Sequence, residues 1–112
     1  MKNDRMYLIQ IQECVQRIGE YTQNGKEHFL RTPLVQDGVV RNFEIIGETT
    51  KQLSQTLKDR YPDIPWKRVA GFRDVLIHDY MGIDLEEVWG IIEKSLSSLE
   101  RQIRAILDSL TP

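Results

Sequence analysis

The last quarter of the chain carries the most regular apolar pattern in the sequence. Apolar residues recur there at alternating spacings of four and three positions: Leu85, Trp89, Ile92, Leu96, Leu99, Ile103, Ile106 and Leu110. Such spacing places one apolar stripe along a single face of an α-helix. A helix of ~26 residues would be about 39 Å long, and its stripe would need other helices to cover it. The pattern therefore predicts a bundle of helices.

The first helix is expected over residues 4–24. Its apolar stripe consists of Tyr7, Ile11, Cys14, Ile18 and Tyr21. The Asn-Gly dipeptide that follows would end the helix, because glycine readily adopts the left-handed backbone conformation. Cys14 lies within the stripe, so we interpret it as a packing residue. Residues 26–31 are expected to form a loop or a single turn, in which His28 is exposed.

Two further helices are expected before the last one. Thr32 followed by Pro33 is typical of an N-cap and the first helical position, and it predicts a helix over residues 33–60. Pro65 can open a third helix that ends near residues 81–82. Asp84, with a glutamate three positions later, is typical of a capping box at the start of the last helix. Four helices joined by short loops predict an all-α, antiparallel four-helix bundle, with residues 1–112 as one domain.

The composition describes an ordinary globular chain with a single cysteine and no long apolar run. Of its 112 residues, 40% are hydrophobic and 29% are charged. No apolar run approaches the ~20 residues of a membrane span, and no signal-peptide core is evident, so no membrane association and a cytoplasmic location are expected. The net charge of −2 argues against a general nucleic-acid binder. Lys67, Arg68 and Arg73 nevertheless fall close together; they form either a local positive site or ordinary solvated helix faces.

One short segment combines residues that suit phosphate chemistry. Arg73, Asp74, His78 and Tyr80 form the pattern Arg-x4-His-x-Tyr, with an acidic residue after the arginine. Arginine binds phosphate oxygens through its planar charged fork, and histidine transfers protons near neutral pH. These groups need no metal when an RNA 2′-hydroxyl is the nucleophile. An Arg and a His near a helix end can also be only a structural hydrogen bond and a C-terminal cap.

The spacing limits how these groups can meet. On a regular helix with about 100° per residue, Arg73 and Tyr80 lie within roughly 20° of each other, whereas His78 points about 140° away. One straight helix therefore cannot aim all three groups at one point. Either the helix is broken near His78, or a second copy of the chain completes the site.

The segment and its neighbours resemble a known family. Residues 71–89 and residues 40–48 look like HEPN domains of the HepT (DUF86) type, and the similarity spans nearly the whole chain. These domains are the toxins of toxin–antitoxin pairs whose antitoxin is a minimal nucleotidyltransferase. The family motif is Arg-x4–6-His, extended in this branch to His-x-Tyr. Arg73, Asp74, His78 and Tyr80 match it position by position.

The resemblance implies a metal-independent ribonuclease that acts as a homodimer on RNA. Arg73 would bind the scissile phosphate, His78 would transfer a proton, and Asp74 would orient one of these groups. Tyr80 resembles the tyrosine to which the nucleotidyltransferase attaches AMP. Glu48, on the second helix, could orient Arg73 if the two helices face each other; otherwise it is a solvent-exposed glutamate.

No cofactor or metal is expected, because the sequence lacks the paired carboxylate and histidine motifs of metal-binding bundles. A second hypothesis is a non-catalytic helical module that binds a nucleotidyltransferase or is its substrate. The acidic net charge favours this alternative, whereas the intact set of Arg73, Asp74 and His78 favours the ribonuclease.

Overall fold

The computed structural model describes residues 3–72 and 84–110 of the chain. Its elements are α1 (Asp4–Tyr21), α2 (Lys26–Arg31), α3 (Pro33–Gln52), α4 (Gln55–Arg60), α5 (Trp66–Ala70), α7 (Leu85–Ile91), the π-helical turn η1 (Ile92–Leu96) and α8 (Ser97–Leu110). No strand occurs in the described ranges. The predicted all-α class is confirmed.

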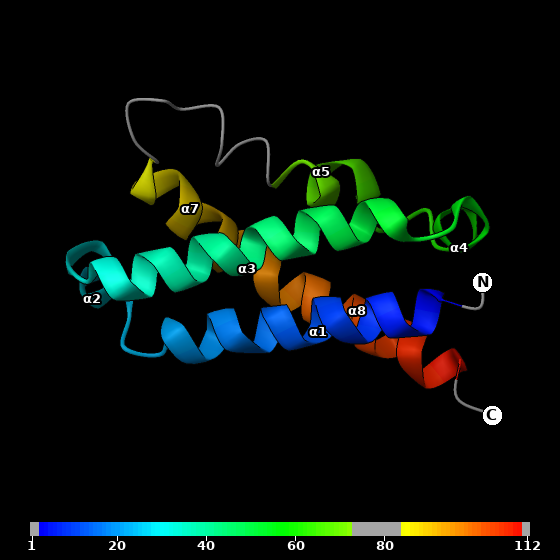
Figure 1. Ribbon diagram of the computed structural model, residues 1–112, viewed down its shortest axis with the longest axis horizontal. Coiled ribbons are helices and arrows are strands. Elements are labelled where there is room, and N and C mark those ends of the chain that lie inside the picture. The colour runs from blue at the N-terminus through cyan, green and yellow to red at the C-terminus, as the bar shows by residue number, and fades with distance from the viewer. Residues whose placement is uncertain (1–2, 73–83, 111–112) are drawn as a thin grey trace.

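α1, α3, α5 and the continuous α7–η1–α8 run alternate in direction along the length of the molecule (Figure 1). α1 and α3 lie side by side and antiparallel, and α8 packs on α1. α5 packs on α3, and α7 lies on the same side of α3 as α5 in Figure 1. The bundle is therefore built on the α1–α3 pair, with α5 and α7 beside α3.

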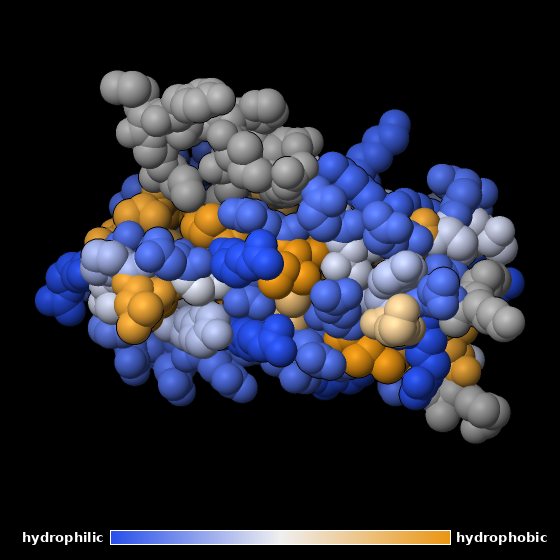
Figure 2. All heavy atoms as spheres, viewed as in Figure 1, coloured by the Kyte–Doolittle hydropathy of each residue, from blue (hydrophilic) through white to orange (hydrophobic). Residues whose placement is uncertain are grey.

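The core forms where the predicted apolar stripes meet. Its buried apolar side chains from the first and last long helices are Leu8, Ile11, Cys14, Val15, Ile18, Val88, Leu96, Leu99, Ile103 and Ile106. Tyr21 was predicted to belong to the first stripe, but 39% of its surface is exposed. The visible face in Figure 2 is mostly hydrophilic, with scattered apolar residues between the polar ones. The helical spacing of apolar residues therefore identified most of the buried core residues, but it wrongly included Tyr21 at the end of α1.

The first helix ends earlier than predicted. α1 stops at Tyr21 instead of Asn24, and at its end the hydroxyl of Thr22 donates a 2.7 Å hydrogen bond to the carbonyl oxygen of Ile18. The same carbonyl also accepts the backbone N–H of Thr22 at 3.0 Å, so both polar groups of Thr22 close the last turn. Gly25, the N-cap of α2, has a φ of 91° and a ψ of 179°, so the positive φ expected of this glycine is present but the left-handed helical conformation is not.

Residues 26–31 are a helix rather than the predicted loop or single turn. The ring of Phe29 is fully buried and lies 5.6 Å from the ring of Trp89, which fixes α2 against α7. His28 is half-buried, and its Nδ1 is enclosed without a hydrogen-bond partner. The prediction of an exposed His28 is therefore wrong. One buried aromatic residue in a six-residue segment has no periodicity from which a helix could be predicted.

The predicted helix over residues 33–60 is divided in two. α3 ends at Gln52, and Leu53 and Ser54 have extended backbones with ψ of 143° and 149°. The Ser54 hydroxyl caps α4 by accepting a 3.1 Å hydrogen bond from the Leu57 amide. The buried carboxylate of Asp4 in turn accepts hydrogen bonds from the Ser54 amide at 2.9 Å and from its hydroxyl at 2.6 Å. These contacts hold the break in place and tie it to the start of α1.

The last predicted helix is present as one helical run that contains a π-helical turn. α7, η1 and α8 continue into each other from Leu85 to Leu110, the predicted extent. A π-helical turn forms i→i+5 hydrogen bonds and holds more residues than an α-helical turn, so the inward face shifts there. In α7 it is Val88 that is fully buried, while the predicted Leu85 and Trp89 are only partly buried.

Candidate active site

The residues of the predicted catalytic motif lie outside the described part of the chain. They are Arg73, Asp74, His78 and the expected AMP acceptor Tyr80. Their roles therefore stay predictions. The structure does describe the residue that precedes Arg73, the helix that follows the motif, and Glu48 on α3.

The segment directly before the motif, from Tyr61 to Phe72, is its upstream flank and is anchored by aromatic packing. Phe72, directly before Arg73, is 4% exposed, and its ring meets the ring of Phe43 edge-on at 5.4 Å. Such edge-to-face pairs add about 0.5–1.5 kcal/mol beyond the burial of their area. At the other end of α5, the indole N–H of Trp66 donates a 3.0 Å hydrogen bond to the carbonyl of Tyr61. The chain therefore enters the motif from a segment fixed to α3.

The third helix was predicted to run from Pro65 through the motif to residues 81–82, with a break near His78 as one alternative. Instead α5 ends at Ala70 after five residues. Gly71 has a ψ of −5°, far from the ψ of about −42° of a regular α-helix. Glycine makes this departure easier, because it is a poor helix former and has no side chain to restrict its backbone. The predicted third helix is therefore wrong at Gly71, where no break was expected.

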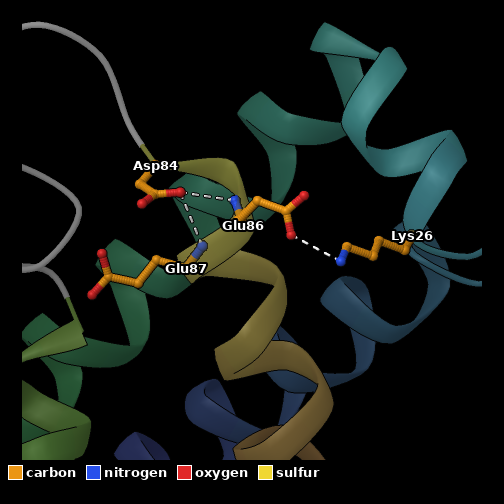
Figure 3. Close-up of polar contacts among 4 residues, drawn as sticks. All are labelled: Lys26, Asp84, Glu86 and Glu87. Carbon is orange, nitrogen blue, oxygen red and sulfur yellow. Dashed lines mark hydrogen bonds and ion pairs between the residues drawn. The ribbon is translucent and has the colours of Figure 1, made fainter.

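The downstream flank begins with a capped helix (Figure 3). The Oδ1 of Asp84 accepts hydrogen bonds from the amides of Glu86 at 3.0 Å and Glu87 at 3.2 Å, as the predicted capping residue should. The carboxylate of Glu86 points to α2, where it binds the ammonium group of Lys26 at 2.8 Å. The hydrogen bond that the Lys26 ammonium group donates to the Glu86 carboxylate raises the pKa of Lys26. α7 is thus attached to α2 by this exposed ion pair and by the buried Phe29–Trp89 contact.

Glu48 lies on the surface of α3. Its carboxylate forms an ion pair of 3.8 Å with the ammonium group of Lys51, and 50% of its side chain is exposed. It also lines a shallow hollow of about 340 Å³ together with Gln10, Arg41 and Glu44. A role for Glu48 in orienting Arg73 stays a prediction, beside the alternative of an exposed glutamate.

A basic groove next to the upstream flank was missed by sequence reasoning. Lys58 of α4 and Lys67 and Arg68 of α5 line a hollow of about 670 Å³, together with one carboxylate, that of Asp59. The sequence places Lys67 and Arg68 near Arg73, but nothing local connects them with Lys58. Only the turn between α4 and α5 brings these cations together.

The described residues provide neither a cluster of metal ligands nor a helix that could span a membrane. Within residues 3–72 and 84–110, no three His, Cys, Asp or Glu side chains gather as ligands for a metal ion. No helix of these ranges is both long and apolar enough to cross a membrane.

The sequence matches a known protein family over most of its length. A family model described as "Ribonuclease HepT-like" matches residues 11–106, which include both flanks and the whole Arg-x4-His-x-Tyr segment. The chain belongs to the HepT-like ribonuclease family. No solved structure matches the chain.

Individual relatives agree with this assignment. A protein of Caldanaerobacter subterraneus named "Putative RNase TTE0752" is 39% identical over 108 residues, covering 96% of both chains. The "Probable ribonuclease HepT" of Thermococcus cleftensis is 36% identical over 100 residues, covering 88% of this chain and 91% of that protein. A Methanocaldococcus jannaschii protein named "Gamma-glutamylcyclotransferase and putative RNase MJ0434" is 38% identical over 110 residues. The match covers 97% of this chain but only 50% of that relative, so this chain spans half of its length.

Proposed function

We propose that this chain is a metal-independent endoribonuclease whose catalytic groups are Arg73, Asp74 and His78. The observation that carries the proposal is the intact set of these three residues within a chain of the HepT-like ribonuclease family. The anchored flanks on either side of the motif support it. They fix the chain at Phe72 before the motif and at Asp84 after it, as a site that must hold reacting groups in place requires.

The proposed reaction is attack of an RNA 2′-oxygen on the adjacent phosphorus. A bond from the 2′-oxygen to phosphorus forms while the bond to the 5′-oxygen breaks, which leaves a 2′,3′-cyclic phosphate and a free 5′-hydroxyl. His78 transfers the proton, Arg73 stabilises the charge that develops on the phosphate oxygens, and Asp74 orients one of these groups. Glu48 is proposed to orient Arg73.

The proposed biological setting is a cytoplasmic toxin–antitoxin pair. We propose that two copies of the chain form a homodimer and that the antitoxin is a minimal nucleotidyltransferase which attaches AMP to Tyr80. The modification adds about one negative charge and a bulky purine. An anionic nucleotide next to Arg73 would pair with the arginine and exclude RNA.

A non-catalytic module that only binds or is modified by a nucleotidyltransferase is the second candidate. The net charge of −2 supports it, because nucleic-acid-binding proteins are normally basic. The two candidates differ in one measurable property, which is cleavage of RNA by the purified protein.

The test uses two oligonucleotides of the same sequence, one RNA and one fully 2′-O-methylated, with the purified protein in excess EDTA. The proposal expects cleavage of the RNA alone, with cyclic phosphate ends detected by mass spectrometry. Cleavage of both oligonucleotides, loss of cleavage with EDTA, or no cleavage by unmodified protein would contradict it.

The modification has its own test. Incubation with the nucleotidyltransferase, ATP and magnesium should raise the mass of the chain by whole AMP units and stop RNA cleavage, whereas Tyr80→Phe should keep cleavage and remain unmodified. AMP found on Tyr7, Tyr21 or Tyr61 instead would refute the role of Tyr80.

A further inference from the structure

Two hollows next to the motif form one basic track across three elements. The larger, about 670 Å³, lies between α4 and α5, and the smaller, about 220 Å³, lies between α5 and the η1–α8 segment. Pro65 and Arg68 line both of them, so the hollows adjoin. The smaller one is also lined by Phe72, the residue directly before Arg73. The track therefore leads from α4 to the edge of the proposed active site.

The cations of this track are available for a ligand. Lys58, Lys67, Arg68 and Lys94 line the two hollows. None of these four takes part in the ion pairs found over the described residues, whereas Arg17, Lys26, Arg41, Lys51 and Arg104 each pair with a glutamate. An unpaired lysine or arginine binds an external anion without first giving up an internal partner.

The remaining lining of the track suits a phosphodiester chain. The lining of the track contains four cations and two carboxylates, those of Asp59 and Asp63. One oxygen of Asp59 already accepts a 2.8 Å hydrogen bond from Gln55. Ser95 and Ser98 add neutral hydrogen-bonding groups in the smaller hollow. Trp66 lines the larger hollow, and its indole N–H is held by the carbonyl of Tyr61, so the ring is fixed in place. Fixed aromatic rings next to cations are typical of single-strand binding grooves.

A third hollow, as lined by the described residues, has only acidic groups among its charged side chains. It measures about 450 Å³, lies between α1 and the η1–α8 segment, and is lined by Glu20 and by Glu100, which pairs with Arg104 at 2.6 Å. A polyanion would therefore be attracted to the unpaired cations of the track more strongly than to this hollow.

We propose that the track formed by Lys58, Lys67, Arg68 and Lys94 binds the sugar-phosphate backbone of single-stranded RNA beside the cleavage point. The inference rests on the proposed ribonuclease function and extends it to the substrate: phosphates lie along the four cations, and a base or ribose packs against Trp66. The cations contact phosphates rather than base edges, so the track contributes affinity and little sequence preference.

The test measures binding of RNA without cleavage. A fluorescein-labelled, fully 2′-O-methylated oligonucleotide is titrated with the full chain in the assembly state in which it is purified. Fluorescence anisotropy gives the Kd at several salt concentrations. Lys67→Gln with Arg68→Gln removes two cations of the track. Arg17→Gln with Arg104→Gln is the matched control, since it removes the same charge from two exposed ion pairs outside both hollows.

The track variant is expected to bind at least about tenfold more weakly at low salt. Its slope of log K against log salt should be smaller by about 1.4, because each lost phosphate contact on a single strand contributes about 0.7. The control variant should stay within about twofold of wild type. Lys58→Gln, a single change on α4, should lower the slope by about 0.7 and serves if the double variant does not fold.

Equal Kd values for the track variant and wild type, or equal weakening by the control, would overturn the inference. These outcomes are independent of catalysis, because the oligonucleotide lacks the 2′-hydroxyl nucleophile. A wild-type protein that binds through the track yet fails to cleave RNA would contradict the proposed function and leave the binding site standing.

Discussion

The hydrogen bonds between Asp4 and Ser54 predict a large loss of stability on a change at the start of α1. Asp4 is 3% exposed, and its carboxylate accepts the Ser54 amide at 2.9 Å and the Ser54 hydroxyl at 2.6 Å. Each hydrogen bond to a charged group contributes about 1.5–3 kcal/mol. Ser54 is only half-buried, so its hydroxyl can turn to water when the carboxylate is removed. Asp4→Ala should therefore lower the free energy of unfolding by about 2–3 kcal/mol, less than two full bonds.

This loss is measurable as a change in melting temperature. With an unfolding entropy of about 2.1 cal/mol/K per residue, a 112-residue protein loses about 4 °C per kcal/mol. Circular dichroism should then show Asp4→Ala melting roughly 8–12 °C below wild type, with Asp4→Asn between the two because it keeps one acceptor oxygen. Asp37→Ala, on the exposed surface of α3, is the control and should stay within about 2 °C. A melting temperature for Asp4→Ala within about 2 °C of wild type would show that the α1–α4 tie does not hold the break at Ser54.

Three smaller predictions concern a cap, a glycine and the buried thiol. Asp84→Ala should lower stability by about 0.5–2 kcal/mol in urea unfolding because two amides at the start of α7 lose their acceptor, and an unchanged midpoint would contradict this cap. Gly19→Ala should raise stability by about 0.5–1 kcal/mol, since nothing lies within 4 Å of the added Cβ; a lower urea midpoint would argue against it. Burial raises the pKa of Cys14 above its ordinary 9.0, so the thiol should react with a disulfide reagent at pH 8 far more slowly in native than in urea-unfolded protein. The stability that depends on the neutral thiol is complete below about pH 9 and is lost as pH rises through the higher folded pKa; equal reaction rates in both states would refute the burial of Cys14.

The parts of the fold that local pattern determines were predictable from sequence. The run from Leu85 to Leu110 was expected from its spacing alone, and its Asp84 cap was expected from one acidic residue before an apolar series. Both depend on residues within a few positions of each other. Helical period and capping are local properties of this kind, and they do not require knowledge of the rest of the chain.

The parts that depend on distant contacts were not predictable. The break after Gln52 is held by hydrogen bonds from Ser54 to Asp4, fifty positions away along the sequence, and α2 is held against α7 by the packing of Phe29 on Trp89. The basic track likewise collects Lys58, Lys67, Arg68 and Lys94 from three elements. The proposed catalytic motif was identified from its spacing and its family resemblance, and spacing alone does not determine how its side chains lie relative to one another.

Cleavage of RNA by wild type, Arg73→Ala and His78→Ala, assayed side by side in EDTA, tests the central claim most directly. Each protein is first melted to establish that it is folded, so that a loss of activity cannot come from unfolding. The proposal predicts cleavage by wild type and a loss of at least about a hundredfold in each variant, as expected when a group acting in the transition state is removed. Folded variants that both cleave at the wild-type rate would contradict the assignment of the catalytic site.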